Sequence, residues 1–196
     1  MKKIFLTLTI LILTFSTQIV ADTSNSIQRI YEGNKDAKVT IITYESLTCG
    51  QCADFHKNVY PQLKKEFIDT GLVKIEFRHF PLDMAALNAS KIAQCNNDGE
   101  SDILHFLFSN QKKWAIGETV ETANENLKKL LKDENIIIDF EKCTNNQKIE
   151  DYVLHDRIEG VKKFKVNATP TIIINNKKFD KTLNYKNLKK SIEKLI

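Results

Sequence analysis

Two cysteines separated by two residues, Cys49 and Cys52, are the side chains of this sequence best suited to chemistry. The residues just before them, 39–44, are apolar or β-branched, which is the composition of a buried strand. After Cys49, apolar residues recur every three or four positions, which is the spacing of one face of a helix. The sequence therefore places Cys49 where a strand leads into a helix, and Cys52 one turn further along that helix.

This position favours a negatively charged sulfur at Cys49. The N-terminus of a helix offers unpaired backbone N–H groups and the positive end of the helix dipole, and both stabilise an anion. We therefore expect the pKa of the Cys49 thiol to be lowered and Cys49 to be the attacking sulfur. Cys52 is placed to close a disulfide with it, so the pair is expected to be redox-active.

A Cys-x-x-Cys pair also occurs in zinc sites, in iron–sulfur sites and as a structural crosslink. A zinc site requires a second close pair, but Cys95 and Cys143 stand alone and the four histidines show no ligand spacing (56, 79, 105, 155). The sequence does not supply the number of cysteine ligands that an iron–sulfur cluster requires near this pair. A crosslink between residues so close in sequence restricts the unfolded chain very little. We therefore expect redox chemistry with no metal ion and no cofactor.

The first 21 residues predict export. Lys2 and Lys3 precede an apolar stretch, residues 4–15, that is short for a membrane span and typical of a cleaved signal peptide. An uncleaved anchor is the alternative, whereas a lipoprotein anchor is disfavoured because no cysteine follows the apolar stretch. We expect residues 1–21 to be a signal peptide and the periplasm to be the site of action.

Composition and charge argue against a nucleic-acid partner. Without residues 1–21 the formal net charge falls from +4 to +2, with 27 Lys and Arg against 25 Asp and Glu. The lysines are dispersed among acidic residues, so we expect a mildly basic, solvated surface. The remaining chain of about 175 residues is long enough to bury a full hydrophobic core.

The elements around the cysteines predict an α/β fold with a helical insertion. Strands at 39–45 and 72–80 flank a helix at 49–69, and we expect Pro61 to kink that helix. The two strands should be parallel, joined by a right-handed crossover. A long helical region follows, with a cap expected at Ser101. The chain then returns to a strand at 171–174, a turn at 175–178, a short edge strand at Phe179 and a closing helix (Leu188, Ile192 and Leu195 on its apolar face).

This order of elements resembles the thioredoxin-fold disulfide oxidoreductases of the DsbA type. Three segments carry the resemblance: residues 44–52 (YESLTCGQC), 77–82 (FRHFPL) and 168–171 (ATPT). It covers the chain from about residue 34 to the C-terminus and implies a thioredoxin fold with an inserted all-helical subdomain. We divide the chain accordingly into a short leader (22–33), two thioredoxin-fold parts (34–83 and 161–196) and the insertion (84–160).

The resemblance implies that the Thr169–Pro170 peptide bond is cis and faces the two cysteines. The backbone at Thr169 would then bind a reduced client protein during the mixed disulfide with Cys49, and the Thr169 hydroxyl would stabilise the Cys49 thiolate. A membrane partner similar to DsbB would reoxidise the pair. Residues 22–33 are too few for a dimerisation segment, so we expect a monomeric oxidase.

Two alternatives remain open for the pair. The first is the reverse direction in the same fold, a disulfide isomerase or reductase. The second is a periplasmic module that binds Cu(I) or Zn through Cys49 and Cys52, although Met84 is the one methionine after residue 21. For Cys95 and Cys143 we weigh two buried free thiols against a structural disulfide. An oxidising compartment favours the disulfide, and some DsbA relatives carry such a second bond.

The sequence also departs from the DsbA archetype. Gly50 and Gln51 stand where the archetype has Pro-His, so we expect a less oxidising pair. Thr43 replaces an acid that is buried in many relatives, which leaves Glu45 or water to take the proton of Cys52. We expect His56 to be a solvated helix residue, and Trp114 to belong to the core of the helical insertion.

Overall fold

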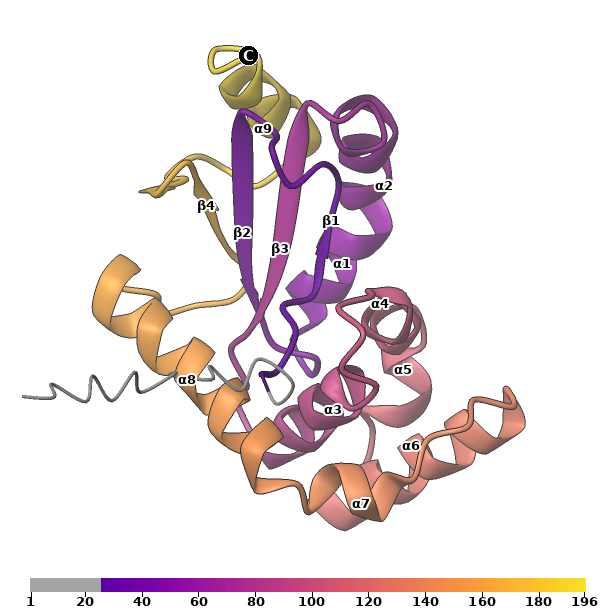
Figure 1. Ribbon diagram of the computed structural model, residues 1–196. Coiled ribbons are helices and arrows are strands. Elements are labelled where there is room, and N and C mark those ends of the chain that lie inside the picture. Colours follow the sequence, from indigo (N-terminus) through magenta and orange to yellow (C-terminus); the bar gives the residue numbers. More distant parts are fainter. Residues whose placement is uncertain (1–25) are drawn as a thin grey trace, which may run out of the picture.

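A mixed five-stranded sheet forms the centre of the protein in the computed structural model, which describes residues 26–196 (Figure 1). The expected signal peptide, residues 1–21, lies outside the described residues. The spatial order of the strands is β1-β3-β2-β4-β5, in which β2 and β3 are parallel and the other neighbours antiparallel. Their bounds are Tyr31–Glu32 (β1), Val39–Glu45 (β2), Val73–His79 (β3), Thr171–Ile174 (β4) and Lys177–Lys178 (β5).

The expected strand–helix–strand unit is confirmed. Strands β2 and β3 pair in parallel from Val39 opposite Val73 to Glu45 opposite His79. The helix between them is divided into α1 (Gly50–Asn58), α2 (Tyr60–Leu63) and a π-helical turn, η2 (Lys64–Ile68). The division falls at Val59, two residues before Pro61, because proline is tolerated in the first turn of a helix but not in its interior.

The N-terminal edge of the sheet departs from the sequence prediction. Tyr31 and Glu32 were expected in a polar leader, but they form β1 and pair with Glu76 and Ile75 of β3. The preceding residue, Ile30, is only 1% exposed and packs in the main core. A two-residue strand is too short to produce a recognisable alternating pattern.

Six helices fill the sequence between β3 and β4. Figure 1 shows α3 to α7 gathered beyond one end of the sheet, while α8 leads back from them to β4. Their bounds are Met84–Gln94 (α3), Asp102–Ser109 (α4), Gln111–Trp114 (α5), Val120–Asp133 (α6), Phe140–Thr144 (α7) and Gln147–Phe164 (α8). As expected, Trp114 is fully buried in the core that these helices share with the sheet. Ser101 precedes α4 but makes no side-chain cap, because its hydroxyl donates instead to Glu32 at 2.6 Å.

The C-terminal hairpin and helix complete the sheet. Asn175 and Asn176 form the turn with φ of 44° and 64°, a left-handed conformation that asparagine tolerates, and the edge strand occupies 177–178, just before Phe179. In α9 (Tyr185–Ile192) Leu188 and Ile192 are buried. Leu195, expected on the same face, lies beyond the end of the helix and is 37% exposed. No helix among residues 26–196 is long and apolar enough to cross a bilayer.

Candidate active site

Cys49 is the residue that caps the N-terminus of α1. Its backbone is extended (φ −80°, ψ 118°), and its carbonyl accepts the first helical hydrogen bonds, from the N–H groups of Cys52 and Ala53. The sulfur is partly buried and faces the first N–H groups of the helix, those of Gln51 and Cys52, which favour its thiolate form. The predicted position of Cys49 at a strand-to-helix junction is therefore the observed one.

The two thiols of the pair are free in the structure and differ sharply in acidity. A hydrogen bond from the Cys52 thiol is the largest influence on Cys49. With hydrogen bonds from Thr169 and from the N–H groups of Cys52 and Gln51, it outweighs partial burial and lowers the pKa of Cys49 to about 5. Burial raises the pKa of Cys52 far above that of an ordinary thiol, and the hydrogen bond to Cys49 and the charge of Glu45 raise it further. Of the two thiols, Cys49 is therefore the one suited to act as a nucleophile, whereas its surroundings favour the protonated thiol at Cys52.

The loop before β4 lies directly against Cys49. The Thr169–Pro170 peptide bond is cis, the geometry that the resemblance implies. The Cys49 thiol donates to the carbonyl oxygen of Thr169, with 3.3 Å between the two heavy atoms. The Thr169 hydroxyl is buried and has no partner among the described residues while the thiol is protonated, so it becomes available as a donor when the thiolate forms.

Gln111 is a residue of this site that the sequence analysis missed. It begins α5 in the helical insertion, and its amide nitrogen donates to the carbonyl oxygens of Leu47 (2.8 Å) and Cys49 (3.0 Å). These bonds tie the loop that carries the nucleophile to the insertion. Nothing in the local sequence around Gln111 signals a contact with residues more than 60 positions earlier.

His56 is buried, so the expectation that it is solvated was wrong. Its Nε2 atom lies 2.9 Å from a carboxylate oxygen of Glu45, and its ring stacks on Phe108 with centroids 4.0 Å apart. The physical reason is that α4, from the helical insertion, covers this face of α1. Glu45, which closes β2, is only 4% exposed and lies close enough to Cys52 to influence its pKa.

A groove of about 600 Å³ runs beside the cysteine pair. Its walls come from α1, from the cis-proline loop and from the segment leading into α9, and they include Gln51, Phe55, Val59, Pro170, Leu183 and Tyr185. Its lining combines apolar with polar side chains.

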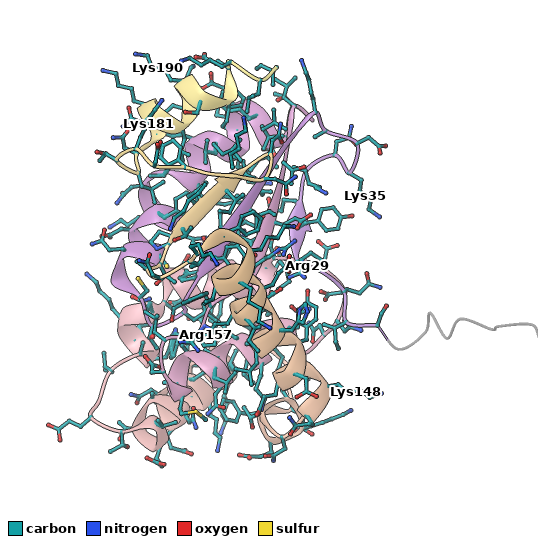
Figure 2. All side chains as sticks on the ribbon, turned by 90° about the vertical axis from the view of Figure 1, so that its left-hand side faces the viewer. Arg29, Lys35, Lys148, Arg157, Lys181 and Lys190 are labelled. Carbon is teal, nitrogen blue, oxygen red and sulfur yellow. A yellow bond between two sulfur atoms is a disulfide. The ribbon has the colours of Figure 1, made fainter. Side chains whose placement is uncertain are left out.

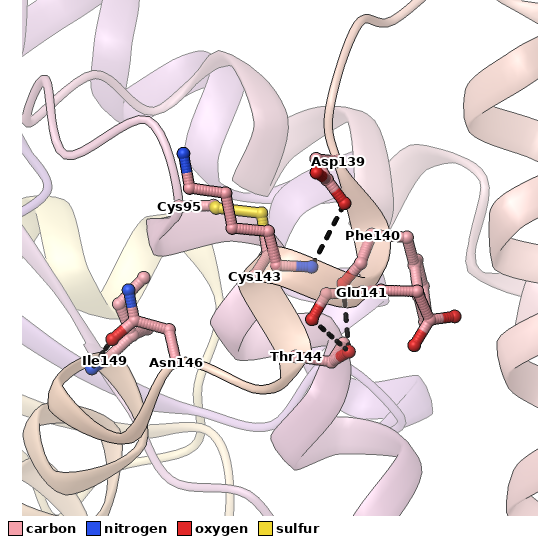
Figure 3. The surroundings of a disulfide bond; sticks show 9 residues. Cys95, Asp139, Phe140, Glu141, Cys143, Thr144, Asn146 and Ile149 are labelled. Carbon is pink, nitrogen blue, oxygen red and sulfur yellow. Dashed lines mark hydrogen bonds between the residues drawn. A yellow bond between two sulfur atoms is a disulfide. The ribbon is translucent and has the colours of Figure 1, made fainter.

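The other two cysteines are joined by a disulfide. Cys95 follows α3 and Cys143 lies in α7, with their Cα atoms 5.5 Å apart (Figure 3). Asp139 caps α7 by accepting from the backbone N–H of Lys142 at 3.0 Å, which fixes the helix that carries Cys143. Cys143 is 1% exposed and packs in the main core, so this bond is shielded on one side by the packed helices.

One cluster of possible metal ligands occurs in residues 26–196, formed by His155, Asp156 and Glu159 of α8, the helix that carries the labelled Lys148 and Arg157 in Figure 2. Its carboxylates already form ion pairs at 2.6 Å, Asp156 with Arg29 and Glu159 with Arg78. Arginine pairing therefore accounts for this cluster, and it lies on a different element from the cysteine pair.

Comparisons with known proteins agree with this geometry. A family model described as "Thioredoxin" matches residues 25–194. The crystal structure of Wolbachia pipientis alpha-DsbA1 is 30% identical in sequence and superposes with a TM-score of 0.74 over 85% of this chain and 90% of that one. Disulfide bond formation protein D of Bacillus subtilis is 28% identical over 180 residues, which are 83% of this chain and 74% of that protein.

A putative protein-disulfide oxidoreductase of Rickettsia bellii is 29% identical over 150 residues. The match covers 73% of this chain but 55% of that protein. The chain thus spans about half the length of the curated Rickettsia relatives that it matches.

Proposed function

Because the chain belongs to the thioredoxin family, and within it to the DsbA-type proteins, we propose that it is a thiol–disulfide oxidoreductase that introduces disulfides into client proteins. The observation that carries this proposal is the split in acidity between the two thiols. A pKa of about 5 keeps Cys49 ionised at neutral pH, whereas burial keeps Cys52 protonated. A stable thiolate makes the reduced pair favourable and the disulfide form a good oxidant.

The cycle begins with the pair in its disulfide form. A client thiolate attacks the sulfur of Cys49, the bond between Cys49 and Cys52 breaks, and Cys52 leaves as a thiolate that takes up a proton. A second client thiolate attacks the client sulfur of the mixed disulfide, and Cys49 leaves as the stabilised thiolate. The client gains a disulfide and loses two electrons, which remain on the reduced Cys49 and Cys52.

The cis-proline loop is the proposed docking site for the client. The backbone at Thr169, next to Pro170, lies within hydrogen-bond distance of the Cys49 thiol, so a peptide bonded to that sulfur passes alongside the loop. The groove beside Pro170 supplies a surface for the residues that flank the client cysteine. These contacts would orient the second client thiol for attack.

We further propose that the protein is exported, acts in the periplasm as a monomer, and is reoxidised by a DsbB-like membrane partner. The composition of residues 1–21 supports export. The disulfide between Cys95 and Cys143 supports an oxidising compartment, since such bonds persist there and are rare in the cytosol.

Oxidation of a reduced model peptide that contains two cysteines tests the function. One equivalent of the oxidised protein should convert the peptide to its disulfide, and the Cys49→Ala variant should not. Alkylation of thiols in intact cells then tests the direction, and we expect the Cys49–Cys52 pair to be mostly oxidised. A mostly reduced pair would instead support a reductase or isomerase.

A further inference from the structure

We propose that Glu45, His56, His105 and Glu32 form a proton relay that exchanges the proton of Cys52 with solvent during each turnover. The inference rests on the proposed function, because it concerns the proton that Cys52 gains when the pair is reduced and loses when it is reoxidised. Glu45 is the carboxylate whose charge raises the pKa of the Cys52 thiol. The two histidines and Glu32 act through Glu45 and are positioning residues rather than catalytic ones.

The four side chains form one continuous chain of hydrogen bonds. Glu45 Oε2 lies 2.9 Å from His56 Nε2, His56 Nδ1 lies 3.0 Å from His105 Nδ1, and His105 Nε2 lies 2.7 Å from Glu32 Oε1. They come from β2, α1, α4 and β1, so the fold assembles the chain from four separate elements. Each distance is short enough for direct proton transfer.

The two inner side chains are buried and the two outer ones reach partly into solvent. Glu45 and His56 are 3% and 4% exposed, whereas His105 is 23% and Glu32 is 14% exposed, and Lys64, which pairs with Glu32, is 42% exposed. Aromatic rings surround the histidines: Phe108 stacks on His56, Tyr60 stacks on His105, and Phe77 meets His105 edge-on. The rings hold both imidazoles in place and leave the hydrogen-bond chain as the polar route from the buried end to the surface.

The geometry fixes how many protons the chain holds. If both histidines donate from Nε2 to a carboxylate, the contact between their Nδ1 atoms needs one further proton, which gives the pair one positive charge. In a second arrangement the proton between the two histidines lies on Nδ1 of His56, and the Nε2 proton of His56 has moved to Glu45. Both imidazoles are then neutral and Glu45 is protonated. The two arrangements contain the same number of protons and differ by a shift along existing hydrogen bonds, so no side chain has to rotate.

The outer end of the chain is built to hold a negative charge. Burial raises the pKa of Glu32, but hydrogen bonds from His105, Lys64, Ser101 and Tyr60 outweigh it and keep the pKa well below its usual value. Lys64 also pairs with the exposed carboxylate of Asp69 at 2.9 Å, which extends the polar contacts to the surface. An ionised Glu32 attracts a proton toward His105, while the exposed end exchanges it with water.

The inner end has one oxygen without a partner. Oε1 of Glu45 is buried and makes no hydrogen bond to any described residue, while Oε2 is occupied by His56. Cys52 is fully buried one turn before His56 on α1, the helix that Glu45 contacts through His56, and the charge of Glu45 acts on its thiol. A carboxylate that accepts a proton at Oε1 and releases one at Oε2 links the thiol to the histidines.

Each half of the redox cycle uses the chain in one direction. When a client thiolate breaks the disulfide, Cys52 leaves as a thiolate and Glu45 gives it a proton that enters from solvent through Glu32 and the histidines. During reoxidation the Cys52 thiol gives its proton to Glu45, the resulting thiolate attacks the Cys49 sulfur of a mixed disulfide, and the partner thiolate leaves. One proton then leaves to solvent through the histidines and Glu32. This outward transfer reverses the inward one and returns the hydrogen-bond chain to its starting state.

Stopped-flow reaction of the reduced full-length chain with an aromatic disulfide reagent separates the two thiols. The first coloured thiolate is released when Cys49 attacks, and the second when Cys52 attacks the resulting mixed disulfide. In His105→Ala we expect the second phase near pH 6.5 to slow by about a hundredfold, the contribution of a positioned acid–base group. The first phase should not change, and His155→Ala, at an exposed histidine of α8, should alter neither phase.

Chemical rescue distinguishes proton transfer from packing. Imidazole added to His105→Ala should restore the second phase, whereas pyrrole, a ring of the same size without an acceptor nitrogen, should not. An unchanged second phase, or equal restoration by the two rings, would overturn the relay. If His105→Ala does not fold, His105→Gln provides the same test, since an amide keeps hydrogen bonds but cannot pass a proton. Loss of the first phase would contradict the proposed function instead.

Discussion

The two cysteine pairs of this protein lie in different parts of the fold and have opposite chemistry. Cys49 and Cys52 are free thiols at the start of α1, where backbone N–H groups and the cis-proline loop surround the half-buried sulfur of Cys49. Cys95 and Cys143 are bonded and join two helices of the insertion across 48 positions of sequence. The same side chain has the surroundings of a nucleophile in the first setting and forms a crosslink in the second.

The difference teaches that polar surroundings, rather than the presence of two nearby cysteines, decide reactivity. The first pair closes a very short loop, so its bond adds little to stability and is free to form and break. The second pair closes a loop long enough to restrict the unfolded chain, and Cys143 lies in the apolar core. One pair is therefore suited to exchange, and the other to stabilising the helical insertion.

Replacement of Cys49 should have the largest effect among the variants that test the contrast between the two cysteine pairs. Cys49→Ala should lower the rate of client oxidation by at least about a thousandfold, because no other thiolate is present at the helix N-terminus. The measurement is oxidation of the two-cysteine peptide, with Cys95→Ala/Cys143→Ala as the control that keeps its rate. Comparable loss in both variants would show that the division of roles is wrong.

Removal of the second pair should affect stability alone. Cys95→Ala/Cys143→Ala should lower the free energy of unfolding by about 4 kcal/mol in the chain-entropy description of a loop of this length. Urea denaturation of the variant and the parent, both with Cys49 and Cys52 reduced, measures the difference. Equal denaturation midpoints would rule out a structural role for this disulfide.

The stability of the reduced protein should depend on pH through Cys49. Its pKa is about 5 in the folded protein and about 8.5 in the unfolded chain, so ionisation stabilises the folded state. This stabilisation is complete at about pH 8.5 and is lost as the pH falls toward 5. Urea midpoints of the reduced and oxidised forms should therefore diverge as the pH rises through this window. A constant difference between them would contradict the lowered pKa.

The two residues between the reactive cysteines should tune the pair more gently. The double variant Gly50→Pro/Gln51→His introduces the dipeptide of the DsbA archetype. The structure accepts proline at position 50, because a Cβ added to Gly50 meets no atom within 4 Å and proline suits the first turn of a helix. We expect a more oxidising pair, by about 30 mV, or tenfold in the exchange equilibrium. Equilibration against glutathione measures the change. An unchanged or more reducing potential would contradict the expectation that Gly50 and Gln51 make the pair less oxidising.

Much of the fold and the centre of the site could be predicted from the sequence, and both the fold class and the DsbA-type recognition are confirmed. Local patterns were sufficient where the chemistry is local: Val39–Glu45 is strongly β-branched, and Cys49 lies at the boundary of the following helix. The cis geometry at Pro170 came from the resemblance, because no residue pattern separates a cis from a trans proline reliably.

What the sequence could not supply are contacts made across long separations. His56 was expected to be a solvated helix residue, yet α4 covers it through His105, which lies 49 positions further along the chain. Gln111 and Glu32 likewise form their hydrogen bonds with residues on other elements, far away in the sequence. Ser101 shows the same limit, since a distant carboxylate competes for the hydroxyl that local rules assign to a helix cap.

The ionisation of Cys49 tests the central claim most directly. The rate of alkylation of the reduced protein is measured from pH 3 to 9, once with the pair intact and once with Cys52 replaced by alanine. The pH at which the rate is half its maximum gives the pKa midpoint of the Cys49 thiol. We predict a midpoint of about 5 for the intact pair and a higher one for Cys52→Ala, because the hydrogen bond from Cys52 is the largest stabilising contact of the thiolate. A midpoint near that of an ordinary cysteine, about 8.5, in the intact pair would contradict the account.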